Sequence, residues 1–298
     1  MRARAARVRA QAKINLTLRI LEREASGFHT LETIFARIAL GDTVTVRITD
    51  AGRSVESDVP IPGAAEGNLA YGAALAFAER TGWPRGFAIE IEKRIPIGGG
   101  LGGGSADAGA VLRALAALSP NPVREEELLA MAASLGSDVP YLTTTAPLAL
   151  AWSRGERMLA LPPLPGRDVV LVLPDFAVST AAAYAWLDDA RRESANAAPR
   201  PSLLALADLS TWPSIAALAT NDFEPAVFAR HPELASILDA LRSAGSSIAL
   251  MSGSGSTLFG VFDPQHAFAT TTIPGIPASA QTVAIRTATS VSPVELLG

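Results

Sequence analysis

The sequence predicts an α+β protein of two domains. Its 298 residues are 49% apolar and 18% charged, which supports a substantial core and argues against widespread disorder. A chain of this length makes two domains or one large one. The predicted strands and helices follow one another without the regular alternation of a doubly wound sheet. Three prolines and a glycine in 161–166 mark the best candidate boundary, which divides the chain into 1–161 and 162–298.

The spacing of apolar residues predicts the elements of the first half of the chain. Its first strand, 13–20, alternates strictly and is expected to be half-buried, with Lys13 and Asn15 on its polar face. The elements expected after it are a turn at 25–27, a strand over 43–48, a helix over 68–80, a strand over 87–91, a helix from near Ser105 to 118, and a helix from 125 to near Gly136. Three glutamates open the last helix, where acidic side chains suit the helix dipole.

The second half of the chain has weaker patterns. A continuous apolar run over 169–173 is typical of a buried strand. The elements expected after it are a helix over 181–187, a mobile polar loop over 191–201, a helix over 232–244, a Gly/Ser loop over 251–256, a buried strand over 257–262 and a strand over 283–286. A proline in the first turn and Gly245 after the end indicate the helix over 232–244.

Charge and composition argue against several classes of function. The 25 basic and 29 acidic residues give a net charge of −4, so no nucleic-acid partner is expected. The chain contains no cysteine, which excludes disulfides and a cysteine nucleophile and fits a reducing compartment. No stretch reaches the ~18 apolar residues of a membrane helix, and no signal peptide is found. We therefore expect a cytoplasmic protein, monomeric or homodimeric, with no membrane partner.

Lysine is rare in this chain. Only two of the 25 basic residues are lysine, Lys13 and Lys93. A lysine kept against this bias can be one whose compact ammonium is required, because a guanidinium differs from it in shape and hydration. For Lys93, chance is an equally good explanation. For Lys13, the alternative is a side chain on a strand face that reaches solvent.

Six glycines within seven positions, 98–104, are the strongest local signal. Glycine lets the backbone approach a ligand closely, and the N-terminus of the helix that follows binds anions, above all phosphate. A Rossmann site would need a continuously apolar strand before the loop, whereas Glu90 and Glu92 interrupt this one. No lysine follows Gly104, as a Walker A motif requires. We therefore predict a phosphate loop built from backbone amides; a flexible linker and a dinucleotide-binding dehydrogenase are the alternatives.

Six segments occur in an order that is far more specific than the glycine loop alone. They are AKINL at 12–16, GFHTL at 27–31, PIGGGLGGGSA at 96–106, LGSDVP at 135–140, NDFEP at 221–225 and SGSGS at 252–256. Together they resemble the GHMP kinases, and within that superfamily the 4-diphosphocytidyl-2-C-methyl-D-erythritol kinase family most closely. Phe28 stands where that family usually has tyrosine, and Ser137 where it has alanine.

The resemblance implies a two-domain fold with mixed and antiparallel sheets. It also implies transfer of phosphate from ATP, accompanied by Mg²⁺, to the 2-hydroxyl of 4-diphosphocytidyl-2-C-methyl-D-erythritol in the non-mevalonate isoprenoid pathway. Asp138 would act as general base on that hydroxyl, and Lys13 would keep the carboxylate ionised and lower the pKa of the hydroxyl. An ordinary turn aspartate is the alternative for Asp138.

The same resemblance implies the binding residues. Those for ATP are Pro96, Ile97, Gly98, Gly99, Gly100, Leu101, Gly102, Gly103, Gly104, Ser105 and Ala106. The Ser105 hydroxyl could also bind Mg²⁺ or cap the helix. Those for the alcohol substrate are Asn15, Phe28, His29, Thr180, Tyr184, Gly253, Ser254 and Gly255. His29 would lie at the cytosine end, where Phe28 or Tyr184 could stack on the base for roughly 1–3 kcal/mol; core packing is the alternative for Tyr184.

Two other functions stay open at this point. One is a different small-molecule kinase of the superfamily, of the homoserine or mevalonate type. The GFH and LGSDVP segments argue against it. The other is a non-catalytic nucleotide-binding protein, which would tolerate the loss of Lys13 and Asp138, yet both residues are present.

Overall fold

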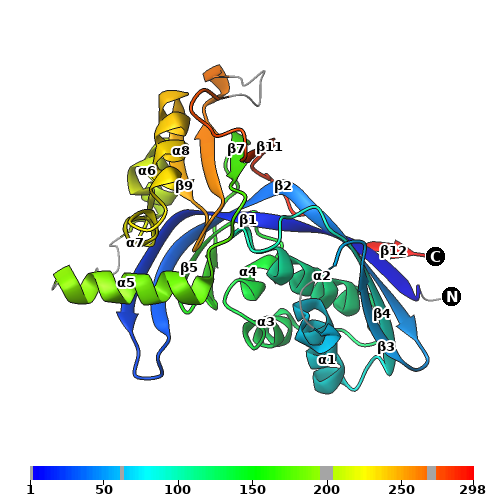
Figure 1. The fold of residues 1–298 in the computed structure, drawn as a ribbon. Coiled ribbons are helices and arrows are strands. Elements are labelled where there is room, and N and C mark those ends of the chain that lie inside the picture. Colours follow the sequence, from blue (N-terminus) through cyan, green and yellow to red (C-terminus); the bar gives the residue numbers. More distant parts are fainter. Residues whose placement is uncertain (1–2, 61–63, 195–203, 267–272) are drawn as a thin grey trace.

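Two β-sheets with helices packed on them make up this computed structural model, which describes residues 3–60, 64–194, 204–266 and 273–298 (Figure 1). The elements up to residue 160 are β1 (Ala5–Arg23), β2 (His29–Thr49), β3 (Arg53–Ser57), α1 (Leu69–Thr81), β4 (Gly86–Glu92), α2 (Gly103–Leu118), α3 (Glu125–Ala133), α4 (Val139–Thr143), β5 (Leu148–Ser153) and β6 (Arg157–Ala160). Strands and helices are thus mixed without regular alternation, and the expected α+β class is confirmed.

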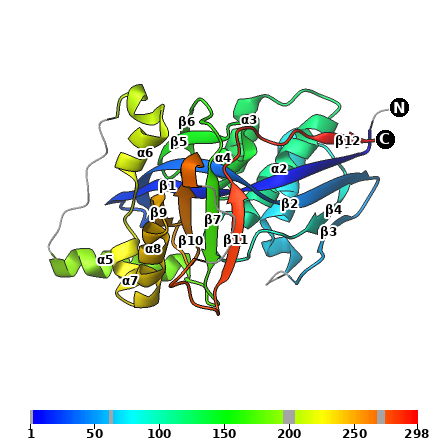
Figure 2. The same cartoon turned by 90° about the horizontal axis from the view of Figure 1, so that it is seen from above.

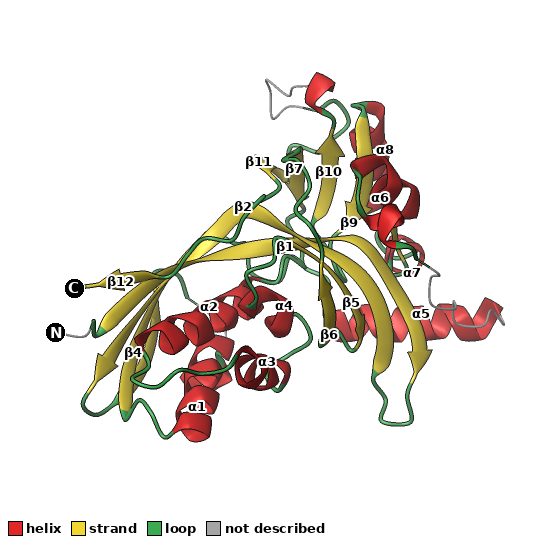
Figure 3. Ribbon diagram, turned by 180° about the vertical axis from the view of Figure 1, so that it is seen from behind, coloured by secondary structure: helices red, strands yellow, loops and turns green. Residues whose placement is uncertain are grey.

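The first sheet is built on the long antiparallel strands β1 and β2. Among the described residues its main path runs β12-β1-β2-β4-β3, with β5 joined to β2, β6 joined to β5, and β8 joined to β1. Helices α1 to α4 pack on the concave side of these curved strands (Figure 3). Asn68 caps the start of α1 with its side chain, and Gly82 ends the helix in a left-handed conformation, as its sequence predicts.

The second sheet begins with β7 and is antiparallel. The elements from residue 168 are β7 (Asp168–Leu173), α5 (Thr180–Ser194), α6 (Trp212–Leu218), β8 (Thr220–Asn221), α7 (Glu224–Phe228), α8 (Pro232–Ser243), β9 (Ser246–Met251), β10 (Leu258–Phe262), β11 (Gln281–Arg286) and β12 (Glu295–Leu297). Its order is β11-β7-β10-β9, with α8 against β9 and β10 (Figure 2). Because β8 and β12 join the first sheet, the division of the chain at residue 161 stays a prediction.

The middle of β1 lies where two hydrophobic cores meet. One core gathers the first sheet, α1 to α4 and α6, together with one face of the second sheet. The other lies between the second sheet, α5, α7 and α8, and it includes Leu18, Ile20 and Leu31 from the far ends of β1 and β2. The polar side chains Lys13 and Asn15 are therefore buried, and the expectation of a half-buried strand is wrong at this point.

The boundaries of three helices differ from those expected, and strands β1 and β2 extend well beyond the expected 13–20 and 43–48. Helix α2 begins at Gly103, because Gly102 takes the N-cap position with a left-handed φ of 72°, so Ser105 lies in the first turn and is not the cap. Helix α3 ends at Ala133, before Gly136. Helix α5 continues to Ser194, so the loop expected over 191–201 is helical at its start, and its residues from 195 lie outside the described residues.

Candidate active site

A cavity of about 490 Å³ lies over the middle of β1. The expected site residues that line it are Lys13, Asn15, Pro96, Gly98, Gly99, Gly100, Leu101, Gly102, Gly103, Gly104, Ser105, Asp138, Thr180, Tyr184, Gly253 and Ser254. Residues near 13, 100, 138, 180 and 253, which are far apart in the chain and which the sequence singled out, thus meet at one place. The expected residues outside its lining are Phe28, His29, Ile97, Ala106 and Gly255.

Lys13 and Asp138 are an ion pair in this cavity. The Nζ atom of Lys13 lies 3.3 Å from Oδ2 of Asp138, and the lysine side chain is almost fully buried while that of Asp138 is 30% exposed. Asp138 precedes α4 at its N-cap position. A buried ammonium thus faces an accessible carboxylate, which is an arrangement suited to a polar reaction. The alternative of a lysine side chain that reaches solvent from a strand face does not apply, because Lys13 is buried.

Lys13 is held by a chain of hydrogen bonds along β1. Its Nζ donates to Oδ1 of Asn15 at 2.7 Å, and Nδ2 of Asn15 donates to Oγ1 of Thr33 at 2.8 Å. The Thr33 hydroxyl then donates to the Thr17 carbonyl at 2.6 Å. Since each donor in this buried chain has an acceptor, the ammonium is fixed in one position. Thr33 gave no signal in the sequence.

The phosphate loop presents backbone amides to the cavity. Gly98, Gly100 and Gly102 have φ values of 76°, 76° and 72°, which side-chain-bearing residues rarely adopt. No side chain caps the amides at the start of α2, in contrast to α1. The free first-turn amides and the helix dipole suit an anion. The Ala106 amide is not among them, because it donates to the Gly102 carbonyl at 2.8 Å.

The Gly/Ser loop after β9 closes the cavity from the second sheet. The Ser252 hydroxyl donates to the Gly100 carbonyl at 3.0 Å, which connects it to the phosphate loop. Nδ2 of Asn221 donates to the Met251 and Gly253 carbonyls at 2.7 and 2.8 Å. Asn221 belongs to a segment that the sequence singled out without giving it a role. Its contacts show that it shapes this loop.

Two aromatic residues in contact with each other, Tyr184 and Phe223, form part of the cavity lining. Tyr184, on α5, stacks on His29 with ring centroids 4.8 Å apart and meets Phe223 edge-on at 4.9 Å. Burial raises the pKa of the Tyr184 hydroxyl to about 12, and the Asp138 charge adds to this rise. The Nε2 atom of His29 lies 2.8 Å from Oδ1 of Asp188. The sequence analysis missed Asp188, because nothing local marks it.

Phe28 lies outside the cavity, whereas Thr180 and Ser254 form part of its wall. Phe28 is 59% exposed at the tip of the β1–β2 hairpin, and the Arg154 guanidinium lies 4.5 Å from its ring centroid. The hydroxyls of Thr180 and Ser254 are 3.0 Å apart in the cavity wall. Phe28 is therefore available to solvent or a ligand, whereas Thr180 and Ser254 join α5 to the Gly/Ser loop.

The described residues contain neither a cluster of metal-binding side chains nor a helix that could span a membrane. No group of three or more histidine, cysteine, aspartate or glutamate side chains in that part of the chain could hold a metal ion. No helix there is long and apolar enough to span a bilayer.

Comparison with known proteins gives consistent matches. The family models for the N-terminal and C-terminal domains of GHMP kinases match residues 68–145 and 203–270. The 4-diphosphocytidyl-2-C-methyl-D-erythritol kinase of Anaeromyxobacter dehalogenans is 43% identical over 261 residues, which cover 85% of this chain and 79% of that protein. That of Moorella thermoacetica is 41% identical over 254 residues, covering 85% and 88%.

Solved structures agree. A crystal structure of 4-(cytidine 5'-diphospho)-2C-methyl-D-erythritol kinase superposes with a TM-score of 0.73 at 35% identity, covering 94% of this chain and 98% of that one. Homoserine kinase from Cytophaga hutchinsonii has a TM-score of 0.68 at 19% identity, covering 99% and 98%. The second match shows a shared fold alone.

Proposed function

The chain belongs to the 4-diphosphocytidyl-2-C-methyl-D-erythritol kinase family of the GHMP kinases, and we propose that it transfers the γ-phosphate of ATP to the 2-hydroxyl of that diphosphocytidyl alcohol. In the cell this would be a cytoplasmic step of the non-mevalonate isoprenoid pathway. The observation that carries the proposal is the Lys13–Asp138 pair, 3.3 Å apart in a cavity that is also lined by the phosphate loop.

The loop from Gly98 to Ser105 would hold the ATP phosphates. Its backbone lines the cavity, and the uncapped amides at the start of α2 supply donors that no side chain satisfies. The Ser105 hydroxyl lines the same wall and is available to a phosphate oxygen or to Mg²⁺. When bound, Mg²⁺ would neutralise phosphate charge.

Lys13 and Asp138 would act on the acceptor hydroxyl. Asp138, the more accessible of the two, would accept or orient the hydroxyl proton, since an ionised carboxylate has only acceptor oxygens and is able to take up a proton. The Lys13 ammonium would stabilise the negative charge that develops on the acceptor oxygen. The Asn15 contact supports this role, because it points Nζ in a fixed direction.

The aromatic part of the cavity lining would bind the cytidine part of the substrate. Tyr184 lines the cavity and offers a ring on which a base could stack, while His29 supports that ring from behind and is itself held by Asp188. Asn15, Thr180, Gly253 and Ser254 line the same cavity and would contact the substrate beside the catalytic pair. Phe28, on the exposed hairpin tip, would reach the base only from outside the cavity.

Turnover with a panel of acceptors tests the proposal. The purified protein is given ATP, Mg²⁺ and either 4-diphosphocytidyl-2-C-methyl-D-erythritol, homoserine or mevalonate, and ADP is measured. We expect ADP formation with the first acceptor at a kcat/KM at least a hundredfold above the others. Preferred use of homoserine or mevalonate would refute the proposed substrate, and ADP formation with none of the three would refute the proposed activity.

A further inference from the structure

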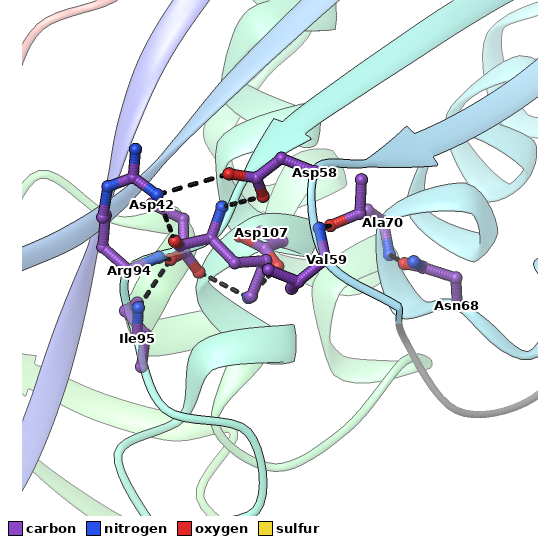
Figure 4. Close-up of polar contacts among 10 residues, drawn as sticks. Asp42, Asp58, Val59, Asn68, Ala70, Arg94, Ile95 and Asp107 are labelled. Carbon is purple, nitrogen blue, oxygen red and sulfur yellow. Dashed lines mark hydrogen bonds and ion pairs between the residues drawn. The ribbon is translucent and has the colours of Figure 1, made fainter.

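A buried ion cluster lies beside the phosphate loop and outside the residues assigned above (Figure 4). It consists of Lys93, Asp42 and Asp107 and is called the Lys93 cluster below. Nζ of Lys93 donates to Oδ2 of Asp42 at 2.5 Å and to Oδ2 of Asp107 at 2.7 Å. The three side chains are 6%, 0% and 3% exposed. They come from β2, from the segment after β4 and from α2, so the cluster connects three separate elements.

Asp42 holds the chain as it enters the phosphate loop. Its Oδ1 atom accepts hydrogen bonds from the backbone amides of Arg94 and Ile95, at 2.5 and 2.7 Å. Pro96, the first loop residue in the cavity wall, follows directly. The position of Asp42 therefore sets the direction in which the loop leaves the sheet.

Asp107 holds the chain where it leaves the loop. It lies in the second turn of α2, whose first turn carries the uncapped amides. The start and the end of the loop also touch, since a Cβ atom at Gly103 would lie 3.1 Å from Cγ2 of Ile95 and 3.6 Å from Nζ of Lys93. The ammonium thus bridges both ends of the loop at the point where they meet.

Stability alone does not account for the Lys93 cluster. Burying three ionisable groups is costly, and well-packed apolar side chains of similar volume often stabilise a fold as well or better. Oδ1 of Asp107 is buried without a hydrogen-bond partner among the described residues. Burial raises the pKa of the Asp107 carboxyl to about 7, against the opposing effect of Lys93. Costly polar arrangements of this kind are retained where geometry matters for function.

We propose that Lys93 is a positioning residue for the nucleotide, which joins the start of the phosphate loop, through Asp42, to the start of α2, through Asp107. The ammonium is suited to this task because it is small and donates to two carboxylates from one nitrogen atom. The space beside it is narrow, since a Cβ atom added at Gly103 would lie 3.6 Å from Nζ of Lys93. The inference rests on the proposed function, since it assumes that the loop binds phosphate.

Nucleotide binding tests the inference independently of the acceptor. Binding of the analogue β,γ-imido-ATP is measured by calorimetry for the wild type, Lys93→Met and Asp107→Ala, and KM values for both substrates are measured by turnover. We expect the nucleotide Kd to rise at least tenfold in Lys93→Met and at least fivefold in Asp107→Ala, while KM for the alcohol changes less than twofold. Asp107→Asn, which keeps an oxygen acceptor for Lys93, is expected to restore binding to within twofold of the wild type.

Arg113→Met is the matched control. Arg113, which lies on α2, is a second buried cation, and its guanidinium donates to the Ser292 carbonyl instead of to the phosphate loop or its neighbours. Its loss should lower the Tm without changing the nucleotide Kd. Asp107→Ala removes a buried charge and leaves the Lys93–Asp42 pair balanced, so it decides the question if Lys93→Met does not fold.

The outcomes distinguish a failure of the positioning role of Lys93 from a failure of the proposed kinase function. Nucleotide binding within twofold of the wild type in Asp107→Ala, and in Lys93→Met where it folds, would overturn the positioning role. A wild type that binds the analogue but does not phosphorylate the diphosphocytidyl alcohol would refute the proposed acceptor and leave the binding comparison valid.

Discussion

Replacing Gly100 with alanine should push apart the two loops that close the cavity. Gly100 has a φ of 76°, and a Cβ atom there would lie 2.1 Å from the Ser252 carbonyl oxygen and 3.2 Å from that of Gly255. Ordinary contact begins at 3.4 Å, so the first distance is short by 1.3 Å (3.4 − 2.1). Both neighbours are backbone atoms, which cannot rotate away, and one loop has to move.

The cost follows from two contributions. A left-handed conformation costs an alanine roughly 1–2 kcal/mol. Separating the loops also breaks the hydrogen bond from the Ser252 hydroxyl to the Gly100 carbonyl, which is worth about 0.5–1.5 kcal/mol. The sum, roughly 1.5–3.5 kcal/mol, corresponds to a decrease of about 10- to 400-fold in kcat/KM for ATP.

Gly82→Ala is the control for this experiment. Gly82 has a φ of 73° but no atom within 4 Å of the Cβ position, and it ends α1 away from the cavity. It should lose roughly 1–2 kcal/mol of stability from the strain of the left-handed conformation alone and keep its kcat/KM for ATP. Steady-state kinetics and urea unfolding of both variants provide the comparison. If Gly100→Ala retains kcat/KM for ATP within threefold of the wild type, the two loops do not act together in binding the nucleotide.

Three further variants test other parts of the structure. Lys13→Met should lower kcat by about 10²- to 10³-fold through lost charge stabilisation, with nucleotide Kd within threefold; an unchanged kcat would exclude Lys13 from the mechanism. Asp188→Ala removes the acceptor that holds His29, so KM for the alcohol should rise about tenfold while KM for ATP stays constant; equal effects on both would contradict a role at the cytidine end. Burial raises the pKa of Glu224 to about 7, against the Met251 amide that lowers it, so the folded state binds a proton that the unfolded state has released. The free energy of unfolding should therefore fall as the pH rises from 5 to 7, by up to ~1.4 kcal/mol per pH unit. Urea unfolding of Glu224→Gln should show a weaker dependence of this free energy on pH. Identical pH profiles for the variant and the wild type would refute this prediction.

Local patterns predicted the parts of the fold that local physics determines. Alternation identified β1 and β4, and the glycine run before a helix identified the phosphate loop. The same run did not reveal where α2 begins, because the cap is a glycine in a left-handed conformation instead of a serine. Strands β8 and β12 have two and three residues, which is too short for a periodic pattern.

Burial depends on segments that are distant in the chain and was harder to predict. Alternation placed Lys13 on a solvent-facing side of β1, whereas the phosphate loop covers it, with the Lys13 amide bonded to the Leu101 carbonyl at 3.0 Å. Asp188 reaches His29 from 159 residues away. Lys93 stood out only by the rarity of lysine. Its two carboxylate partners, on which the proposed positioning role rests, are visible only in three dimensions.

In the proposed mechanism, Asp138 acts on the acceptor hydroxyl beside Lys13. Single-turnover phosphorylation of 4-diphosphocytidyl-2-C-methyl-D-erythritol by Asp138→Asn tests it most directly, because asparagine keeps the shape of the side chain and removes its negative charge. The predicted result is a rate at least ~10³-fold below that of the wild type, with an unchanged Tm and a nucleotide Kd within threefold. A rate within tenfold of the wild type would show that the Asp138 carboxylate has no such role in the transfer.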